Sequence, residues 1–110
     1  MLFLTAEDFL HQVKAIPPLT RDEERALTAA VAAGDPAART RLVRGYLPFV
    51  AAFVRRAPRS VRTLTTVYAC IAALERAVDR FDFTRGDRSF AHHLGWALRQ
   101  TVTRCIADHT

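Results

Sequence analysis

The sequence contains few of the residues and motifs from which catalytic or metal sites are built. Its 110 residues include two cysteines, four glycines and four histidines. There is no glycine-rich phosphate loop, no nucleophile elbow and no pair of carboxylates isolated in an apolar stretch. His92 and His93 are adjacent and diverge on a helix, while Cys105 and His109 supply two ligands where a structural zinc site needs four. We therefore expect no enzyme, no cofactor and no metal ion.

Long apolar runs and secretion signals are also missing. The opening residues MLFL are too short for a signal peptide, and no apolar stretch approaches the roughly 20 residues of a membrane span. Cys70 and Cys105 lie within apolar helical patterns without zinc-type spacing, so we interpret them as reduced thiols. These features predict a cytoplasmic protein with no membrane partner.

Positive charge is abundant but unevenly distributed. Residues 1–35 carry three cations and six carboxylates, a net charge of −3, whereas residues 36–110 carry thirteen arginines and five carboxylates, a net charge of +8. A chain of this length is expected to form one domain over residues 1–110. Its basic part, 36–110, is the candidate surface for a polyanion. Arginine abundance alone is weak support, because codon bias in a GC-rich genome also produces it.

Helical periodicity extends along the chain and no alternating strand pattern appears. This predicts an all-α fold, a single compact bundle of about five helices. Thr5 and Thr20 each stand three residues before an acid, as in a capping box, and predict the starts of the first two helices. The prolines at 17–18 separate these helices, and "GDP" at 34–36 ends the second and starts a third.

Longer helical segments follow. The third segment has an apolar face as far as Phe53, and Pro48 should kink or break it. Residues 64–81 repeat apolar side chains at alternating spacings of three and four, a near-heptad seam that must pack against another helix. A turn at "TRGD" (84–87) comes next, and Ser89 can cap a last helix that runs to about Asp108.

The last helix carries a polar stripe within "WALRQTVTR". The residues at helical spacings i, i+3, i+4, i+7 and i+8 are Trp96, Arg99, Gln100, Thr103 and Arg104. An exposed indole can stack on an unpaired base, while amide and hydroxyl groups reach base edges and arginines neutralise phosphates. Spacing alone equally allows a partly buried tryptophan beside a solvated arginine face.

Four motifs in order give the chain a family resemblance. They are "PPLTRDEERAL", "GDPAARTRLV", "ALERAVDRFDFTRG" and "WALRQTVTR", within a similarity that extends from about Phe9 to Asp108. In these motifs the chain resembles the N-terminal part, through conserved region 2, of bacterial RNA polymerase sigma factors of the housekeeping-like group. The resemblance implies a compact helical domain that recognises the AT-rich upstream promoter hexamer and captures flipped bases of the melted strand.

The resemblance also implies roles for individual residues. Gln100 and Thr103 fall where the family contacts the first, still-paired position of the hexamer, and Trp96 falls beside the melting fork. Two arginines of the stripe would lie along the DNA backbone. The full set of DNA-binding candidates is Trp96, Arg99, Gln100, Thr103, Arg104, His93, Arg85 and Arg88.

Two aromatic positions depart from the family pattern. The second tryptophan of the family's pair is Ala97 here, and the tyrosine that stacks on the flipped adenine corresponds to His93. Stacking of a base on an aromatic ring is worth about 1 to 3 kcal/mol. We therefore expect strand capture and melting to be weaker than in an ordinary sigma factor.

The polymerase-gripping sequence of the family departs further. This chain has "LTTVYAC" at 64–70, with Thr65, Tyr68 and Ala69 where the family has aspartate, glutamine and glutamate. The resemblance therefore implies a weakened contact with the RNA polymerase core. The candidates for contact with polymerase or another partner are Leu64, Thr65, Tyr68, Ala69, Arg55, Arg56, Arg59 and Arg62.

Two functions from different classes remain open. The first is a transcription factor that binds promoter DNA through its last helix, beside a second protein supplying the later sigma domains, because the 110 residues do not include them. The alternative is a protein-interaction module, a regulator or decoy, that keeps the sigma scaffold without reading DNA. The retained "RQTVTR" favours the first function, and the altered "LTTVYAC" favours the second.

Overall fold

A computed structural model describes residues 2–86 and 88–109, and within these residues the chain is helical without strands. Six α-helices and two short 3₁₀ turns are present in this part of the chain. They are α1 (Ala6–Gln12), η1 (Val13–Ala15), α2 (Arg21–Ala32), α3 (Pro36–Gly45), α4 (Leu47–Arg56), η2 (Arg59–Val61), α5 (Leu64–Arg80) and α6 (Phe90–His109). The predicted all-α class is confirmed.

The helix starts follow the predicted capping residues. The Thr5 hydroxyl accepts a hydrogen bond from the Asp8 backbone N–H at 2.9 Å, and Thr20 and Glu23 form a complete capping box at α2. Asp35 caps α3, and the Ser89 hydroxyl accepts from the His92 N–H at 3.2 Å at the start of α6. Each cap satisfies backbone donors that the first helical turn leaves unpaired.

The third predicted segment is two helices rather than one. α3 ends at Gly45 and α4 begins at Leu47, with Tyr46 between them and Pro48 in the first turn of α4. Because proline has no N–H to donate, it is tolerated in a first turn but not within a continuous helix. The prediction that Pro48 kinks or breaks this segment is confirmed, with the break at Tyr46, and the described residues therefore form six α-helices where about five are predicted. Of the predicted "TRGD" turn, Asp87 lies outside the described residues.

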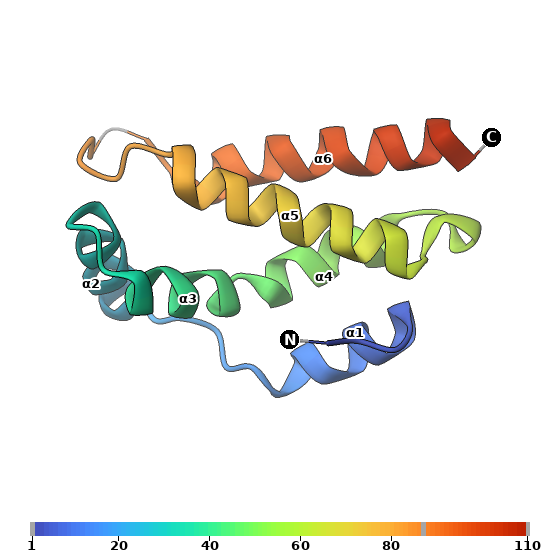
Figure 1. Ribbon diagram of the computed structural model, residues 1–110, viewed down its shortest axis with the longest axis horizontal. Coiled ribbons are helices and arrows are strands. Elements are labelled where there is room, and N and C mark those ends of the chain that lie inside the picture. Colours follow the sequence, from blue (N-terminus) through green and yellow to red (C-terminus); the bar gives the residue numbers. More distant parts are fainter. Residues whose placement is uncertain (1, 87, 110) are drawn as a thin grey trace.

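α5 lies in the middle of the bundle. In Figure 1 it runs between α6 on one side and α3 and α4 on the other, and it contacts all three. Its seam residues Val67, Leu74 and Val78 are fully buried, while Leu64 and Phe81 are half-buried against the same core. The near-heptad seam therefore faces the interior of the bundle, and α6 packs along α5.

None of the helices in the described ranges combines the length and the apolar character needed to cross a bilayer. Cys70 is buried, Cys105 is half-buried, and both thiols are free. Burial of Leu94 and Leu98 fixes the rotation of α6 about its own axis. The opposite face of α6 is therefore presented to solvent.

Candidate nucleic-acid interface

The polar stripe predicted on the last helix is exposed in the structure. Trp96 is 55% exposed, which is unusual for so large an apolar side chain. The Arg99 guanidinium carbon lies 5.5 Å from the centre of the Trp96 ring, within cation–π range. Gln100, Thr103 and Arg104 are exposed on the same helix. This exposure leaves more than half of the Trp96 surface accessible to solvent.

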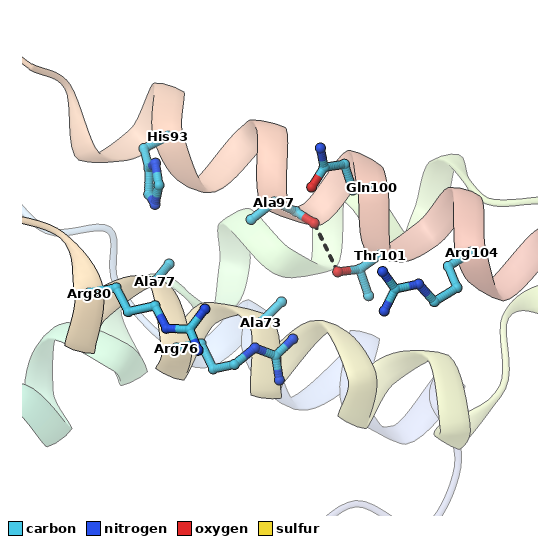
Figure 2. A pocket seen from close by; sticks show the side chains of 9 residues that line it. All are labelled: Ala73, Arg76, Ala77, Arg80, His93, Ala97, Gln100, Thr101 and Arg104. Atoms are coloured by element: carbon cyan, nitrogen blue, oxygen red, sulfur yellow. Dashed lines mark hydrogen bonds between the residues drawn. The ribbon is translucent and has the colours of Figure 1, made fainter.

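A hollow of about 260 Å³ lies along α6 where it meets α5. Its lining residues are Ala73, Arg76, Ala77 and Arg80 from α5, with His93, Ala97, Gln100, Thr101 and Arg104 from α6. Figure 2 shows arginines of both helices reaching toward the space between them. None of the nine lining side chains is acidic. The hollow is therefore an electropositive groove, which we call the α5–α6 groove.

Small side chains keep the α5–α6 groove open. Ala73 and Ala77 on α5 and Ala97 on α6 line it, and the Thr101 hydroxyl turns inward to donate to the Ala97 carbonyl oxygen at 2.8 Å (Figure 2). A threonine hydroxyl bonded to its own helix has one fewer hydrogen bond to offer a ligand. The groups left to meet a ligand in the groove are the arginines, the imidazole of His93 and the amide of Gln100.

Arg76 and Arg80 extend the candidate interface beyond the predicted residues. They are spaced i, i+4 on the face of α5 away from its buried seam, and both are exposed. That spacing is visible in the sequence. The sequence does not show which side of α5 packs against α6, because that depends on the tertiary structure. The position of these two arginines beside α6 could therefore not be predicted.

The remaining DNA candidates lie near the start of α6. His93 is half-buried, with its ring centre 5.3 Å from that of Phe81. The Arg88 guanidinium carbon lies 5.9 Å from the same Phe81 ring. A second hollow brings Arg88, His93 and Trp96 together, along with Ser89 and His92. Arg85 is exposed in the preceding loop, outside that hollow.

The predicted partner-binding residues do not form one face. The Arg62 guanidinium forms hydrogen bonds within the chain, at the end of α4. Its Nε and Nη2 donate to the carbonyl oxygens of Ala57 and Arg55 at 2.9 and 2.6 Å. Arg55 Nη2 donates to the Leu10 carbonyl oxygen at 3.4 Å, whereas the neighbouring Arg56 lines a hollow with residues of α6.

The other members of the partner-binding set are divided between α5 and η2. Arg59 is exposed on η2, and Thr65 and Tyr68 are exposed on α5. Leu64 and Ala69 are half-buried. Leu64 belongs to the internal seam and packs against the core, so little of its side chain is left for a partner.

Comparison with known proteins shows similarity to sigma factors. The profile described as "Sigma-70 factor, region 1.2" matches residues 4–37, which include α1 and α2. RNA polymerase sigma factor SigA of Listeria monocytogenes is 35% identical over 101 residues, 91% of this chain and 27% of that protein. Over most of its length the chain is therefore similar to bacterial RNA polymerase sigma factors. SigA of Clostridium acetobutylicum is 32% identical over the same length, 91% of this chain and 26% of that protein.

The sigma factor similarity reaches the candidate interface. An alignment covering 91% of a 110-residue chain includes all of α5 and the first half of α6, wherever it begins. The sigma factor family is not a family of enzymes. The chain spans about a quarter of the length of these relatives.

Proposed function

We propose that this sigma factor domain binds AT-rich promoter DNA through α6, as part of transcription initiation or its regulation in the cytoplasm. The observation that carries the proposal is the continuity of the exposed α6 stripe with the α5–α6 groove. Gln100 belongs to both, so a side chain able to contact a base edge stands beside arginines able to hold the phosphates.

The arginines of the proposed interface have different roles. Arg76, Arg80 and Arg104 come from two helices and line one groove, which suits a phosphate backbone that follows α6. Trp96 and Arg99 lie on the other side of the α6 stripe, beside the proposed melting fork. With Ala97 and His93 at family aromatic positions, we expect DNA binding to survive and base capture to be weak.

Fluorescence anisotropy with a labelled AT-rich promoter duplex tests the proposal. Arg76→Ala and Arg104→Ala should each weaken binding to all sequences and lower the slope of log affinity against log salt by about one. Gln100→Ala should reduce the preference for the correct base at one base pair, a preference worth about 1 to 3 kcal/mol of binding free energy. Arg21→Ala, which removes an exposed arginine from α2, is the matched control. Undetectable wild-type binding at low salt, with polymerase present, would contradict the proposal.

The alternative, a module that binds protein without reading DNA, is favoured by one surface. Leu2 and Leu4 are 80% and 78% exposed near Tyr68, whose own side chain is 37% exposed. If polymerase binds here, we expect a weaker contact than in ordinary sigma factors, because Thr65 and Ala69 cannot replace two carboxylates. Calorimetry with a clamp-helix fragment of polymerase measures this, and nanomolar affinity would contradict the expected weakening.

We further propose that a second protein supplies additional promoter-reading surface. One helix face contacts few base pairs, and small modules rarely reach genomic specificity alone. Joining two weak readers raises the effective concentration of the second into the millimolar range. Reconstituted transcription with core polymerase tests this. Specific initiation by these 110 residues alone would refute the need for a partner, and initiation dependent on a co-purified protein would support it.

A further inference from the structure

His93 lies where two basic hollows meet. Among the described residues it alone lines both the α5–α6 groove and the neighbouring hollow at the start of α6, whose volume is about 410 Å³. Its side chain is half-buried and points from α6 toward α5 (Figure 2). The Phe81 ring packs beside the imidazole, with 5.3 Å between the ring centres. A ligand that enters either hollow therefore meets the same imidazole.

Four arginines line these two hollows together with His93. Arg76 and Arg80 come from α5 and Arg104 from α6, whereas Arg88 comes from the loop before α6. All four side chains are exposed. An anion beside His93 is therefore surrounded by guanidinium groups from three parts of the chain.

Carboxylates do not line these hollows. Neither lining includes an acidic side chain among the described residues. On α5, Asp79 forms its ion pair with Arg39 of α3, and Glu75 also interacts electrostatically with Arg39. In the loop, Asp82 accepts hydrogen bonds from the Thr84 N–H and hydroxyl, and it attracts the loop arginines. The negative charge that neutralises a protonated imidazole in these hollows must therefore come from a bound ligand.

We propose that His93 binds a DNA phosphate in its protonated form, so that the affinity of this domain for DNA rises as the pH falls from about 8 to about 6. Imidazole changes its charge in this pH range. A phosphate stabilises the charged ring and not the neutral one, so phosphate binding and proton uptake favour each other. His92 is exposed and does not line the α5–α6 groove, so fewer of the arginines surround it. The inference rests on the proposed DNA-binding function and adds a pH dependence to it.

Fluorescence anisotropy at pH 6 and pH 8, at one fixed ionic strength, tests the proposal with the full 110-residue protein. The probes are labelled AT-rich and GC-rich duplexes of equal length, since a phosphate contact should act on both. We expect the wild type to bind each duplex about tenfold more tightly at pH 6. His93→Gln cannot gain a charge, so its affinity should differ by less than about twofold between the two pH values.

Two further variants sharpen this test. His93→Lys carries a charge at both pH values, so it should bind at pH 8 about as tightly as the wild type binds at pH 6. His11→Gln removes an exposed imidazole from α1, far from the two hollows in sequence, and it should keep the pH dependence of the wild type.

Nitrogen-15 NMR of the His93 ring gives a readout that does not require promoter recognition. The charged fraction of the imidazole is measured at pH 7 before and after saturation with long-chain inorganic polyphosphate, whose internal groups stay ionised at this pH. We expect the charged fraction to rise about twofold, and to rise similarly with either duplex.

The outcomes separate this inference from the promoter-binding proposal. A preference for the AT-rich duplex that does not change with pH, with no change in the charged fraction of His93, overturns the role of His93 and leaves the promoter proposal standing. A pH dependence that His93→Gln abolishes, on both duplexes alike and with the same rise on polyphosphate, supports the role of His93 while the promoter proposal fails. Absence of any response to the duplexes and to polyphosphate overturns both.

Discussion

The Tyr68 hydroxyl accepts a hydrogen bond from the Phe3 backbone N–H at 3.0 Å and donates to the Phe3 carbonyl oxygen at 3.4 Å. The Phe3 side chain is 3% exposed and meets Phe9 edge to face, with ring centres 4.9 Å apart. The segment ahead of α1 is thereby fastened to the outer face of α5. Tyr68 occupies a position that the family resemblance assigns to polymerase contact, yet its polar atom is already bound within the chain.

Removing this hydroxyl should loosen the N-terminal segment without unfolding the bundle. Tyr68→Phe leaves the Phe3 N–H without its partner in a partly buried place, so we expect a loss of about 1 kcal/mol in the free energy of unfolding. Phe3→Ala removes a buried ring and should cost about 3 kcal/mol. Urea denaturation measures both losses. Hydrogen exchange adds a local readout, because the Phe3 amide should exchange faster in Tyr68→Phe, and unchanged exchange would count against the bond.

Much of the fold could be predicted because its determinants are local. Capping by Thr5, Thr20, Asp35 and Ser89, and the break at Pro48, each depend on residues within one helical turn. The exposed stripe of α6 follows in the same way, since helical periodicity alone separates it from the buried leucines.

The parts that could not be predicted depend on contacts between distant segments. The bond between Phe3 and Tyr68 joins residues 65 positions apart, and no local pattern indicates it. The sequence groups Arg56 with Tyr68 as partner-binding candidates, and the rotation of α4 places Arg56 in a hollow with residues of α6. The near-heptad seam of α5 predicts that another helix packs against it but does not identify that helix. The grooves beside α6 are lined by residues of two helices, so helical spacing alone could not predict them.

Burial of Cys70 should make stability depend on pH in the alkaline range. Burial, with a smaller effect from Cys105, raises the pKa of Cys70 from its ordinary value near 9 to about 12. The folded state therefore holds this proton more tightly, and the resulting stability is complete below pH 9 and is lost as the pH rises toward 12. Cys70→Ala should cost about 1 kcal/mol at pH 7, through the lost sulfur contacts. The gap between the wild type and Cys70→Ala should narrow at pH 10 in urea denaturation under reducing conditions, and a constant gap would contradict the shift.

The ion pair between Arg39 of α3 and Asp79 of α5 should make stability depend on pH in the acidic range. Arg39 Nε and Nη2 donate to the two carboxylate oxygens of Asp79 at 2.6 and 2.9 Å. Hydrogen bonding from Arg39 lowers the pKa of Asp79, so the pair stabilises the fold above the ordinary carboxyl pKa of about 4 and this contribution is lost as the pH falls below it. Because both side chains are partly exposed, Asp79→Asn should cost only about 0.5 kcal/mol at pH 7. Arg39→Gln should lower the free energy of unfolding by a similar amount, and the double variant should be only slightly less stable than either single variant. Urea denaturation of the four proteins at pH 7 and pH 3, as a double-mutant cycle, measures these differences.

Two helical glycines should respond in opposite ways to the same substitution. Gly95 lies within α6, where an added methyl group meets Phe53 Cζ at an ordinary 3.8 Å. Gly95→Ala should therefore gain about 0.5 to 1 kcal/mol from reduced backbone entropy in the unfolded chain. At Gly45, the last residue of α3, the added carbon would lie 2.6 Å from both Cγ and Cδ1 of Leu19, a side chain packed against the core.

Relief of that clash at Gly45 requires the whole Leu19 side chain to move, since its branch point is as close as its tip. Overpacking of this kind costs about 1 to 3 kcal/mol, which exceeds the gain in helix propensity, so Gly45→Ala should lower the free energy of unfolding by about 1 kcal/mol. Combining Gly45→Ala with Leu19→Ala should cost less than the sum of the single changes, because the clash is then absent. Thermal and urea denaturation of the four variants measure these differences. Equal stabilisation by Gly45→Ala and Gly95→Ala would mean that Leu19 has room to move, and that the segment before α2 packs against α3 more loosely than the contact between Gly45 and Leu19 indicates.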